Sequence, residues 1–242
     1  MKILVNGSSL SAQPDTWPYQ LQKRLSCDMI NLSMPGCGND YVHDTTISQV
    51  ALNSYDLVLI MWPMVPTRTD WAIDTVPLLM DNTDSNGFVS EWYAANLVPE
   101  SSRHHIERNW IFGMSHIIDQ HQQTPPERRS AVSNIFSEYY QHVRAPQLFR
   151  TSLLRTITLQ NTLKQMAVPF VFMLNCQFDR LPRFAHINSL IDWDCYYTDQ
   201  HLSDYAKQHG LIDPSDPLHV LEQAHIEFAD LLIEHLRDRN YV

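Results

Sequence analysis

Short apolar runs, each bounded by turn residues, constrain the fold of this chain more than any other feature. Lys2–Asn6 ends at a glycine, Asp56–Trp62 ends at a proline, and Val168–Leu174 forms a third run. We expect each run to be a buried β-strand, and we expect further strands at Met29–Leu32 and, as a short last strand, at Leu190–Trp193.

Segments with helical spacing lie between these strands. Apolar residues recur every four positions in Pro14–Leu25, and Asp40–Leu52 has the composition of a helix. Arg128–Met166 is expected to form one or two helices, with Pro146 breaking the stretch. A helix with one apolar side is expected at His219–Arg237. The alternation of strand and helix is typical of a parallel sheet with crossover helices.

The length and composition suit one large domain. The chain has 242 residues, of which 44% are hydrophobic and 18% charged, so it can bury a sizeable core. We predict an α/β fold, a three-layer αβα sandwich around a central parallel sheet, in a single domain spanning residues 1–242. Residues 67–126 carry prolines, polar residues and scattered aromatics. We expect this part to be an insertion of loops and short helices, a candidate lid or substrate wall.

The net charge of the chain and the length of its apolar runs limit the kinds of partner that it is expected to bind. The formal net charge is −10, which argues against binding to nucleic acid or to an anionic membrane surface. No apolar run reaches the roughly 18 residues of a membrane span, and the first run is too short for a signal peptide. The four cysteines lack metal-ligand spacing, so we expect buried thiols. The sequence therefore predicts a cytoplasmic protein without nucleic-acid or membrane partners.

Three segments at predicted strand ends carry chemistry-bearing residues. Ser9 follows a glycine turn after the first strand, Gly36 and Gly38 lie in the turn after the second, and Asp216 precedes His219 by three residues. Ligands of open parallel sheets bind outside the carboxyl ends of the strands. On a turn, the Asp216 carboxylate can orient the His219 imidazole, which can then accept a proton from a serine hydroxyl.

These segments together resemble the SGNH (GDSL-like) hydrolase family. Ile3-Leu-Val-Asn-Gly-Ser-Ser-Leu-Ser11 resembles its opening motif, with Ser9 in the nucleophile position. Asn31-Leu-Ser-Met-Pro-Gly36 resembles its second block, and Asp216-Pro-Leu-His219 matches the Asp-x-x-His of its last block. The resemblance spans residues 3 to about 232. It implies the flavodoxin-like SGNH hydrolase fold.

The sequence departs from the family pattern in two blocks. Ser8 stands where an aspartate usually precedes the nucleophile, and Trp62-Pro-Met-Val-Pro66 stands where Gly-x-Asn-Asp is usual. The family's asparagine in that block donates a hydrogen bond to the oxyanion, and losing such a donor costs on the order of 100- to 1000-fold in rate. Asn39, Asn175 and Arg68 are the candidate substitutes, and Gly38 is an alternative to Gly36 at the oxyanion.

The resemblance implies a serine esterase, acyl hydrolase or acyltransferase. Ser9 would attack the ester carbonyl, His219 would act as base, and Asp216 would hold the imidazole. The N–H groups of Ser9 and Gly36 would stabilise the oxyanion. The substrate would be a small or carbohydrate O-acyl ester, and no metal or organic cofactor is implied. Arg68 is a further candidate for binding a substrate carboxylate or hydroxyl.

Other interpretations of the same residues stay open. Ser9 is also consistent with a turn or helix-capping role, and Asp216 with capping the final helix. His225 is expected to be packed and structural. The histidines between residues 104 and 121 lack the accompanying carboxylates or cysteines of a metal site. The alternative functions are a catalytically degenerate binding or interaction module and, less favoured, a nucleotide-binding domain, which would need a P-loop lysine or spaced glycines.

Overall fold

A central parallel sheet of five strands organises the molecule. The computed structural model describes residues 1–63, 69–73, 109–113, 139, 142–143, 145–175 and 184–242. The sheet order is β2-β1-β3-β6-β7, and all its neighbouring strands are parallel. Its strands are β1 (Lys2–Gly7), β2 (Asp28–Asn31), β3 (Leu57–Trp62), β6 (Phe170–Leu174) and β7 (Tyr196–Tyr197). This is the flavodoxin-like strand order, and it confirms the predicted α/β class.

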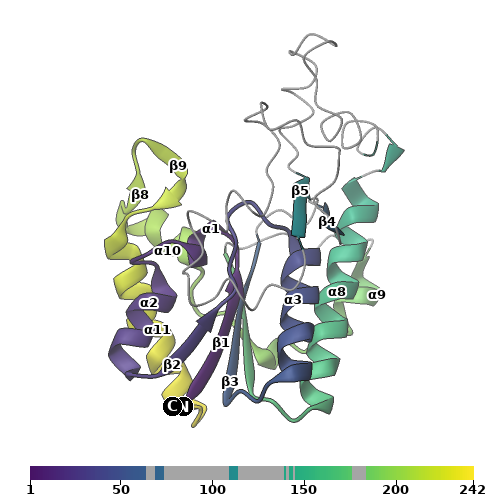
Figure 1. The fold of residues 1–242 in the computed structure, drawn as a ribbon. Coiled ribbons are helices and arrows are strands. Elements are labelled where there is room, and N and C mark those ends of the chain that lie inside the picture. The colour runs from purple at the N-terminus through teal and green to yellow at the C-terminus, as the bar shows by residue number, and fades with distance from the viewer. Residues whose placement is uncertain (64–68, 74–108, 114–138, 140–141, 144, 176–183) are drawn as a thin grey trace.

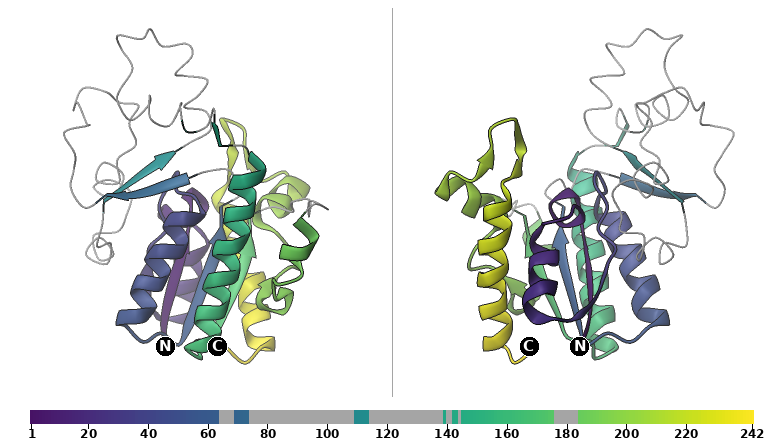
Figure 2. Two further views of the ribbon diagram at one scale, coloured as in Figure 1. Left: turned by 90° about the vertical axis from the view of Figure 1, so that its right-hand side faces the viewer. Right: turned by 60° about the vertical axis from the view of Figure 1, so that its left-hand side comes forward.

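Helices cover both faces of the sheet and make it the middle of three layers (Figure 1). One side carries α1 (Ser9–Ala12), α2 (Trp17–Leu25), α10 (Leu202–His209) and α11 (Glu222–Asp238). The other carries α3 (Asn39–Leu52), α8 (Ala145–Gln165) and the short α9 (Ala185–Asn188). Both termini lie at the end of the sheet opposite the carboxyl ends of its strands (Figures 1 and 2).

The alternation of side chains along the strands gives each face its own core. Val58 and Ile60 of β3 belong to the cluster packed with α3 and α8, together with Leu4 of β1. Leu59 of β3 and Val5 of β1 belong to the cluster packed with α2 and α11. A strand buried on both faces has no polar alternation, which is why these strands are continuous apolar runs in the sequence.

Two small antiparallel pairs lie beyond the main sheet. β4 (Thr69–Ile73) pairs with β5 (Asn109–Gly113), and the pair lies near the N-terminal end of α3, at the carboxyl edge of the sheet (Figure 1). β8 (Ile212–Asp213) pairs with β9 (Asp216–Val220) in a hairpin before α11. The insertion expected at residues 67–126 therefore contains one described strand pair, and its remaining residues lie outside the described part of the chain.

Some predicted elements differ from those observed. The last strand is not Leu190–Trp193 but β7; a 3-10 helix, Trp193–Cys195, precedes it directly. Pro146 lies in the first turn of α8, a position where its missing N–H costs nothing. Tyr139 and His142 are helical and a bend at Val143 precedes α8, in agreement with the break expected near Pro146. The segment predicted as one helix at Pro14–Leu25 becomes helical only at Trp17.

The described cysteines are free thiols, and none of the described helices meets the requirements of a membrane span. Cys27 and Cys37 are buried and Cys195 is half-buried, none in a disulfide, whereas Cys176 lies outside the described residues. No helix in the described part of the chain combines the length and the apolar character needed to cross a bilayer.

Candidate active site

The turn that carries Ser9 begins where β1 ends. Ser9 is the first residue of α1, and Ser8 occupies the N-cap position without a side-chain capping bond. The backbone N–H of Ser11 donates to the Ser8 carbonyl at 2.9 Å and closes this turn. Ser9 itself is half-buried. The structure thus places Ser9 at a helix start directly after the first strand, as predicted.

Close packing at Gly7 determines the path of this turn. A Cβ atom at Gly7 would lie 2.8 Å from the Ser11 Oγ and 2.9 Å from the Met61 carbonyl oxygen. Both distances are shorter than side-chain carbon contacts allow. Glycine is therefore required for the end of β1 to lie this close to both β3 and α1.

Asn6 fixes the end of β1 against α3. Its side chain is fully buried, and its Nδ2 donates to the Val42 carbonyl at 3.3 Å and to the hydroxyls of Thr45 and Thr46 at 2.8 and 3.0 Å. Its Oδ1 accepts the Gly7 N–H at 2.9 Å. The amide is therefore satisfied on both ends, as a buried polar group must be, and it contributes support, not chemistry.

The loop after β2 is held against the same turn. Cys37 N–H donates to the Met34 carbonyl at 3.3 Å, with Pro35 and Gly36 between them. Gly36 has a φ of 81°, so the turn has the proline and the left-handed glycine of a type II turn. The Met34 N–H donates to the Gly7 carbonyl at 3.0 Å. The candidate oxyanion loop therefore lies directly beside the end of β1.

Asn31 connects the first and second turns. Its Nδ2 donates to the Ser11 carbonyl at 2.7 Å and its Oδ1 accepts the Ser33 N–H at 3.0 Å. Further along the loop, Gly38 is the N-cap of α3 and Asn39 is the first residue of that helix. Gly36, Gly38 and Asn39 are thus brought to the carboxyl edge of the sheet, as predicted.

The three candidate substitutes for the missing asparagine lie in different surroundings. Asn39 is buried, donates from Nδ2 to the Ser152 Oγ of α8, and has an Oδ1 without a hydrogen-bond partner. Asn175, after β6, accepts the Ser203 hydroxyl at 2.6 Å. Arg68 lies outside the described residues. Of the two described amides, Asn39 is the one with an uncommitted polar atom.

Asp216 and His219 form a hydrogen-bonded pair. His219 Nδ1 and Asp216 Oδ2 are 2.6 Å apart, with the side chains 31% and 47% exposed. His219 Nε2 is buried and has no hydrogen-bond partner in the described structure. The predicted carboxylate–imidazole contact is confirmed, and the opposite ring nitrogen remains available for proton transfer.

The backbone around this pair differs from the prediction. Asp216 and His219 lie in β9 instead of on a turn, and α11 begins only at Glu222. The N-cap of α11 is Leu221. The interpretation of Asp216 as the cap of the final helix is therefore wrong, because a strand of the hairpin separates the carboxylate from the helix.

Ser9 and His219 approach from two elements at the same end of the sheet. The β8–β9 hairpin stands at the carboxyl end of the sheet, on the side of α1 (Figure 1). Leu10, which follows Ser9, and Val220, which follows His219, belong to one buried apolar cluster. The described structure contains no hydrogen bond between the Ser9 hydroxyl and His219. The structure brings the two residues to one region without joining them.

His225 is a second imidazole near this pair. It lies in the first turns of α11, is 5% exposed, and its Nδ1 has no hydrogen-bond partner among the described residues. Burial, with a smaller contribution from the charge of His219, lowers the pKa of His225 to about 4. The expectation of a packed His225 is confirmed.

Metal ligands are not grouped in the described part of the structure. No set of three or more His, Cys, Asp or Glu side chains in that part is arranged to hold a metal ion. The histidines between residues 104 and 121 lie outside the described residues.

Sequence reasoning missed three of the residues that shape this region. Asn6 had a detectable signal, because a buried polar residue at the end of an apolar strand requires partners. Asn31 was noted only as part of a motif. Ser152 had none, since its contact with Asn39 joins residues 113 positions apart.

Comparisons with known proteins bear on the fold. No protein-family model matches the chain, and a search of curated proteins finds no match. Among solved structures, the psychrotrophic esterase EstA from Pseudoalteromonas sp., inhibited by monoethylphosphonate, is 11% identical with a TM-score of 0.53. The match covers 100% of this chain and 99% of EstA. An acetyl xylan esterase, AlAXEase, is 10% identical over 98% of this chain and 100% of its own, with a TM-score of 0.44. The likeness to EstA agrees with the predicted fold, a three-layer αβα sandwich around a central parallel sheet, and at this identity it bears on the fold alone.

Proposed function

We propose that this protein is a serine-dependent ester hydrolase or acyltransferase. The observation that carries the proposal is the Asp216–His219 pair, whose free Nε2 lies at the end of the sheet where Ser9 begins α1. A carboxylate on one ring nitrogen and an uncommitted second nitrogen are the arrangement of a general base. The fold likeness to an esterase supports ester chemistry.

The proposed reaction follows acyl-transfer logic. Ser9 Oγ attacks the ester carbonyl carbon while His219 Nε2 takes the hydroxyl proton, and Asp216 stabilises the imidazolium that forms. The protonated His219 then gives its proton to the leaving alcohol oxygen as the C–O bond breaks. Water, or an acceptor hydroxyl, attacks the acyl-serine in the second half and regenerates Ser9.

The oxyanion of this reaction needs donors beside Ser9. The N–H groups of Ser9 and Gly36 are the proposed donors, with Gly38 as the alternative to Gly36. The hydrogen bond from the Met34 N–H to the Gly7 carbonyl supports this assignment because it holds the Gly36 turn beside β1. Donors fixed before the reaction stabilise the developing charge without reorganisation.

The proposal requires a contact that tightens when substrate binds. His219 Nε2 must come within about 2.6–3.2 Å of the Ser9 hydroxyl for proton transfer, and such contacts are often long without substrate. The substrate class proposed is a small or carbohydrate O-acyl ester. The acyl acceptor is water in hydrolysis and another hydroxyl group in acyl transfer, and the products of the reaction show which of the two is used.

The test is hydrolysis of p-nitrophenyl acetate and butyrate by wild type, Ser9→Ala and His219→Ala. Ser8→Ala is the matched control, because Ser8 is adjacent and makes no side-chain capping bond. We expect activity in wild type and Ser8→Ala and its loss in the other two, with circular dichroism unchanged. A fluorophosphonate is expected to label wild type at Ser9 and to leave Ser9→Ala unlabelled.

The second candidate function is a binding module that has lost catalysis. Two observations favour it: the absence of a Ser9–His219 hydrogen bond in the described structure, and Trp62-Pro63 where an asparagine motif would follow β3. Wild-type protein that neither hydrolyses the esters nor reacts with a fluorophosphonate would establish this candidate over the enzyme.

A further inference from the structure

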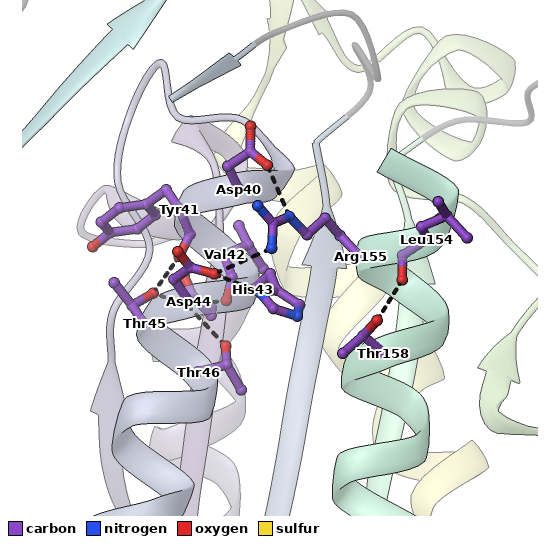
Figure 3. A network of polar contacts seen from close by, with 11 residues as sticks. Asp40, Tyr41, Val42, His43, Asp44, Thr45, Thr46, Leu154, Arg155 and Thr158 are labelled. Atoms are coloured by element: carbon purple, nitrogen blue, oxygen red, sulfur yellow. Dashed lines mark hydrogen bonds and ion pairs between the residues drawn. The ribbon is translucent and has the colours of Figure 1, made fainter. Parts of the chain in front are cut away.

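Side chains of α8 contact the first turn of α3, close to the candidate site, in two places. Arg155 Nε lies 3.0 Å from Asp40 Oδ1, and its guanidinium also reaches Asp44 at 3.8 Å, as Figure 3 shows. One turn earlier on α8, the Ser152 Oγ accepts a hydrogen bond from Asn39 Nδ2. The helix α8 therefore contacts both of the first two residues of α3.

The two contacts differ in burial, which decides what each contributes. Arg155 is 39% exposed, and ion pairs of that exposure contribute about 0–1 kcal/mol. Asn39 and Ser152 are only 8% and 7% exposed. Polar groups buried to that extent must find partners, so their mutual hydrogen bond determines how each is oriented.

The Asn39–Ser152 pair leaves one polar atom of the amide uncommitted. Asn39 Oδ1 has no hydrogen-bond partner, and Ser152 makes no other hydrogen bond in the described structure. Turning the carboxamide by 180° keeps its shape and lets the Ser152 hydroxyl donate to Oδ1, so that Nδ2 becomes the uncommitted atom. In this second arrangement the hydroxyl hydrogen of Ser152 has an acceptor, and both N–H donors of Asn39 Nδ2 remain uncommitted.

The position of this amide relates it to the nucleophile turn. Asn6, near the end of β1, donates to the Val42 carbonyl in the first turn of α3. The loop leading into α3 is bonded to the Gly7 carbonyl. The first residue of α3, Asn39, is therefore held at the same edge as Ser9 from two directions.

We propose that Ser152 is a positioning residue of the candidate site: its hydroxyl holds the Asn39 carboxamide so that the uncommitted N–H meets the substrate's carbonyl oxygen. Asn39 is then the group that touches substrate, and Ser152 acts through it. This inference rests on the proposed ester chemistry. A carboxamide held in one orientation acts as a preorganised donor, whereas an unheld one must be ordered during the reaction.

The test compares kcat and KM for p-nitrophenyl acetate among Ser152→Ala, Ser152→Thr, Asn39→Ala and the double alanine variant. Ser152→Ala is expected to lower kcat roughly 10-fold, with KM nearly unchanged, because only the transition state loses its oriented donor. Asn39→Ala is expected to cost on the order of 100-fold. The double variant is expected to match Asn39→Ala alone, and Ser152→Thr, which keeps the hydroxyl, to retain most of the rate.

Two further variants separate orientation from structure. Thr158→Ala removes a hydroxyl of the same helix that donates to the Leu154 carbonyl one turn earlier and, among the described residues, makes no other hydrogen bond (Figure 3); we expect it to leave kcat unchanged. Asn39→Asp keeps the shape of the side chain but removes its N–H donors. We expect it to lower kcat as much as Asn39→Ala does, even if the alanine variants fold poorly.

Several outcomes would overturn the inference. A full rate in Ser152→Ala, a KM effect without a kcat effect, or additive losses in the double variant would each exclude a positioning role. If Ser9→Ala abolishes activity while Ser152→Ala retains it, this inference fails and the proposed function stands. If Ser9→Ala retains the wild-type rate, the proposed function fails and the inference fails with it. The rate of fluorophosphonate labelling at Ser9 gives a second readout of the same donor.

Discussion

Replacing His225 with leucine is expected to make the stability of the protein less sensitive to acid. His225 is 5% exposed, and burial is the main reason that its pKa falls from the ordinary 6.5 to about 4. Its Nδ1 has no hydrogen-bond partner among the described residues, so a proton there would be neither solvated nor paired. Leucine has a similar volume and does not titrate.

The sign and size of the effect follow from proton linkage. The unfolded chain protonates this histidine near pH 6.5, while the folded chain does so only near pH 4. Between these values the unfolded state binds more protons, so the free energy of unfolding falls as the pH falls. The loss attributable to His225 is about 2 kcal/mol at pH 5 and about 3 kcal/mol below pH 4, relative to pH 8.

Urea denaturation of wild type and His225→Leu at pH 8, 7, 6 and 5 measures this loss. Wild type is expected to lose about 2 kcal/mol more than the variant between pH 8 and pH 5. Contributions from His201 and His235, whose pKa values burial also lowers, are common to both proteins and cancel. The exposed His186, changed to glutamine, serves as the control. Parallel pH curves for wild type and His225→Leu would refute the reasoning.

Two further predictions concern the candidate site. Gly7→Ala places a Cβ atom 2.8 Å from the Ser11 Oγ and 2.9 Å from the Met61 carbonyl; we expect a loss of about 1–3 kcal/mol in thermal or urea unfolding, together with slower fluorophosphonate labelling. Unchanged stability would contradict the packing. Asp216→Asn is expected to lower kcat for p-nitrophenyl acetate on the order of 1000-fold or more, because His219 loses its orienting carboxylate. The pair is half-exposed, so its stability should change by under about 1 kcal/mol; a large loss of stability with an intact kcat would reverse this assignment.

The main elements of the fold were predictable because the central strands are buried on both faces and therefore consist of apolar residues. β1, β3 and β6 are covered by helices on both faces, so each is an unbroken apolar run bounded by turn residues. The last strand was misplaced at Leu190–Trp193, since β7 is two residues long and shows no periodicity. Leu190 is 60% exposed, so its apolar character did not mark a buried position.

The candidate site was predictable only where its residues are close in sequence. Asp216 and His219 are three positions apart, and their contact was expected from that spacing alone. Their placement in β9 was not, because a strand whose sequence is Asp-Pro-Leu-His-Val owes its extended form to pairing with β8. The approach of Asn39 to Ser152 depends on how α3 and α8 pack, and no local pattern specifies that.

The polar side chains at the strand ends divide into support and chemistry by whether their hydrogen bonds are complete. Asn6 and Asn31 make hydrogen bonds with both the nitrogen and the oxygen of the amide, so each braces the turn after β1. His219 and Asn39 each keep one buried polar atom without a partner in the described structure. Such an atom costs stability unless something binds it. Both atoms belong to segments at the end of the sheet where Ser9 lies. His219 Nε2 is suited to accept the proton of the Ser9 hydroxyl, and the turned Asn39 carboxamide is suited to donate to an ester carbonyl oxygen, which is the physical reason to look for catalysis at this edge.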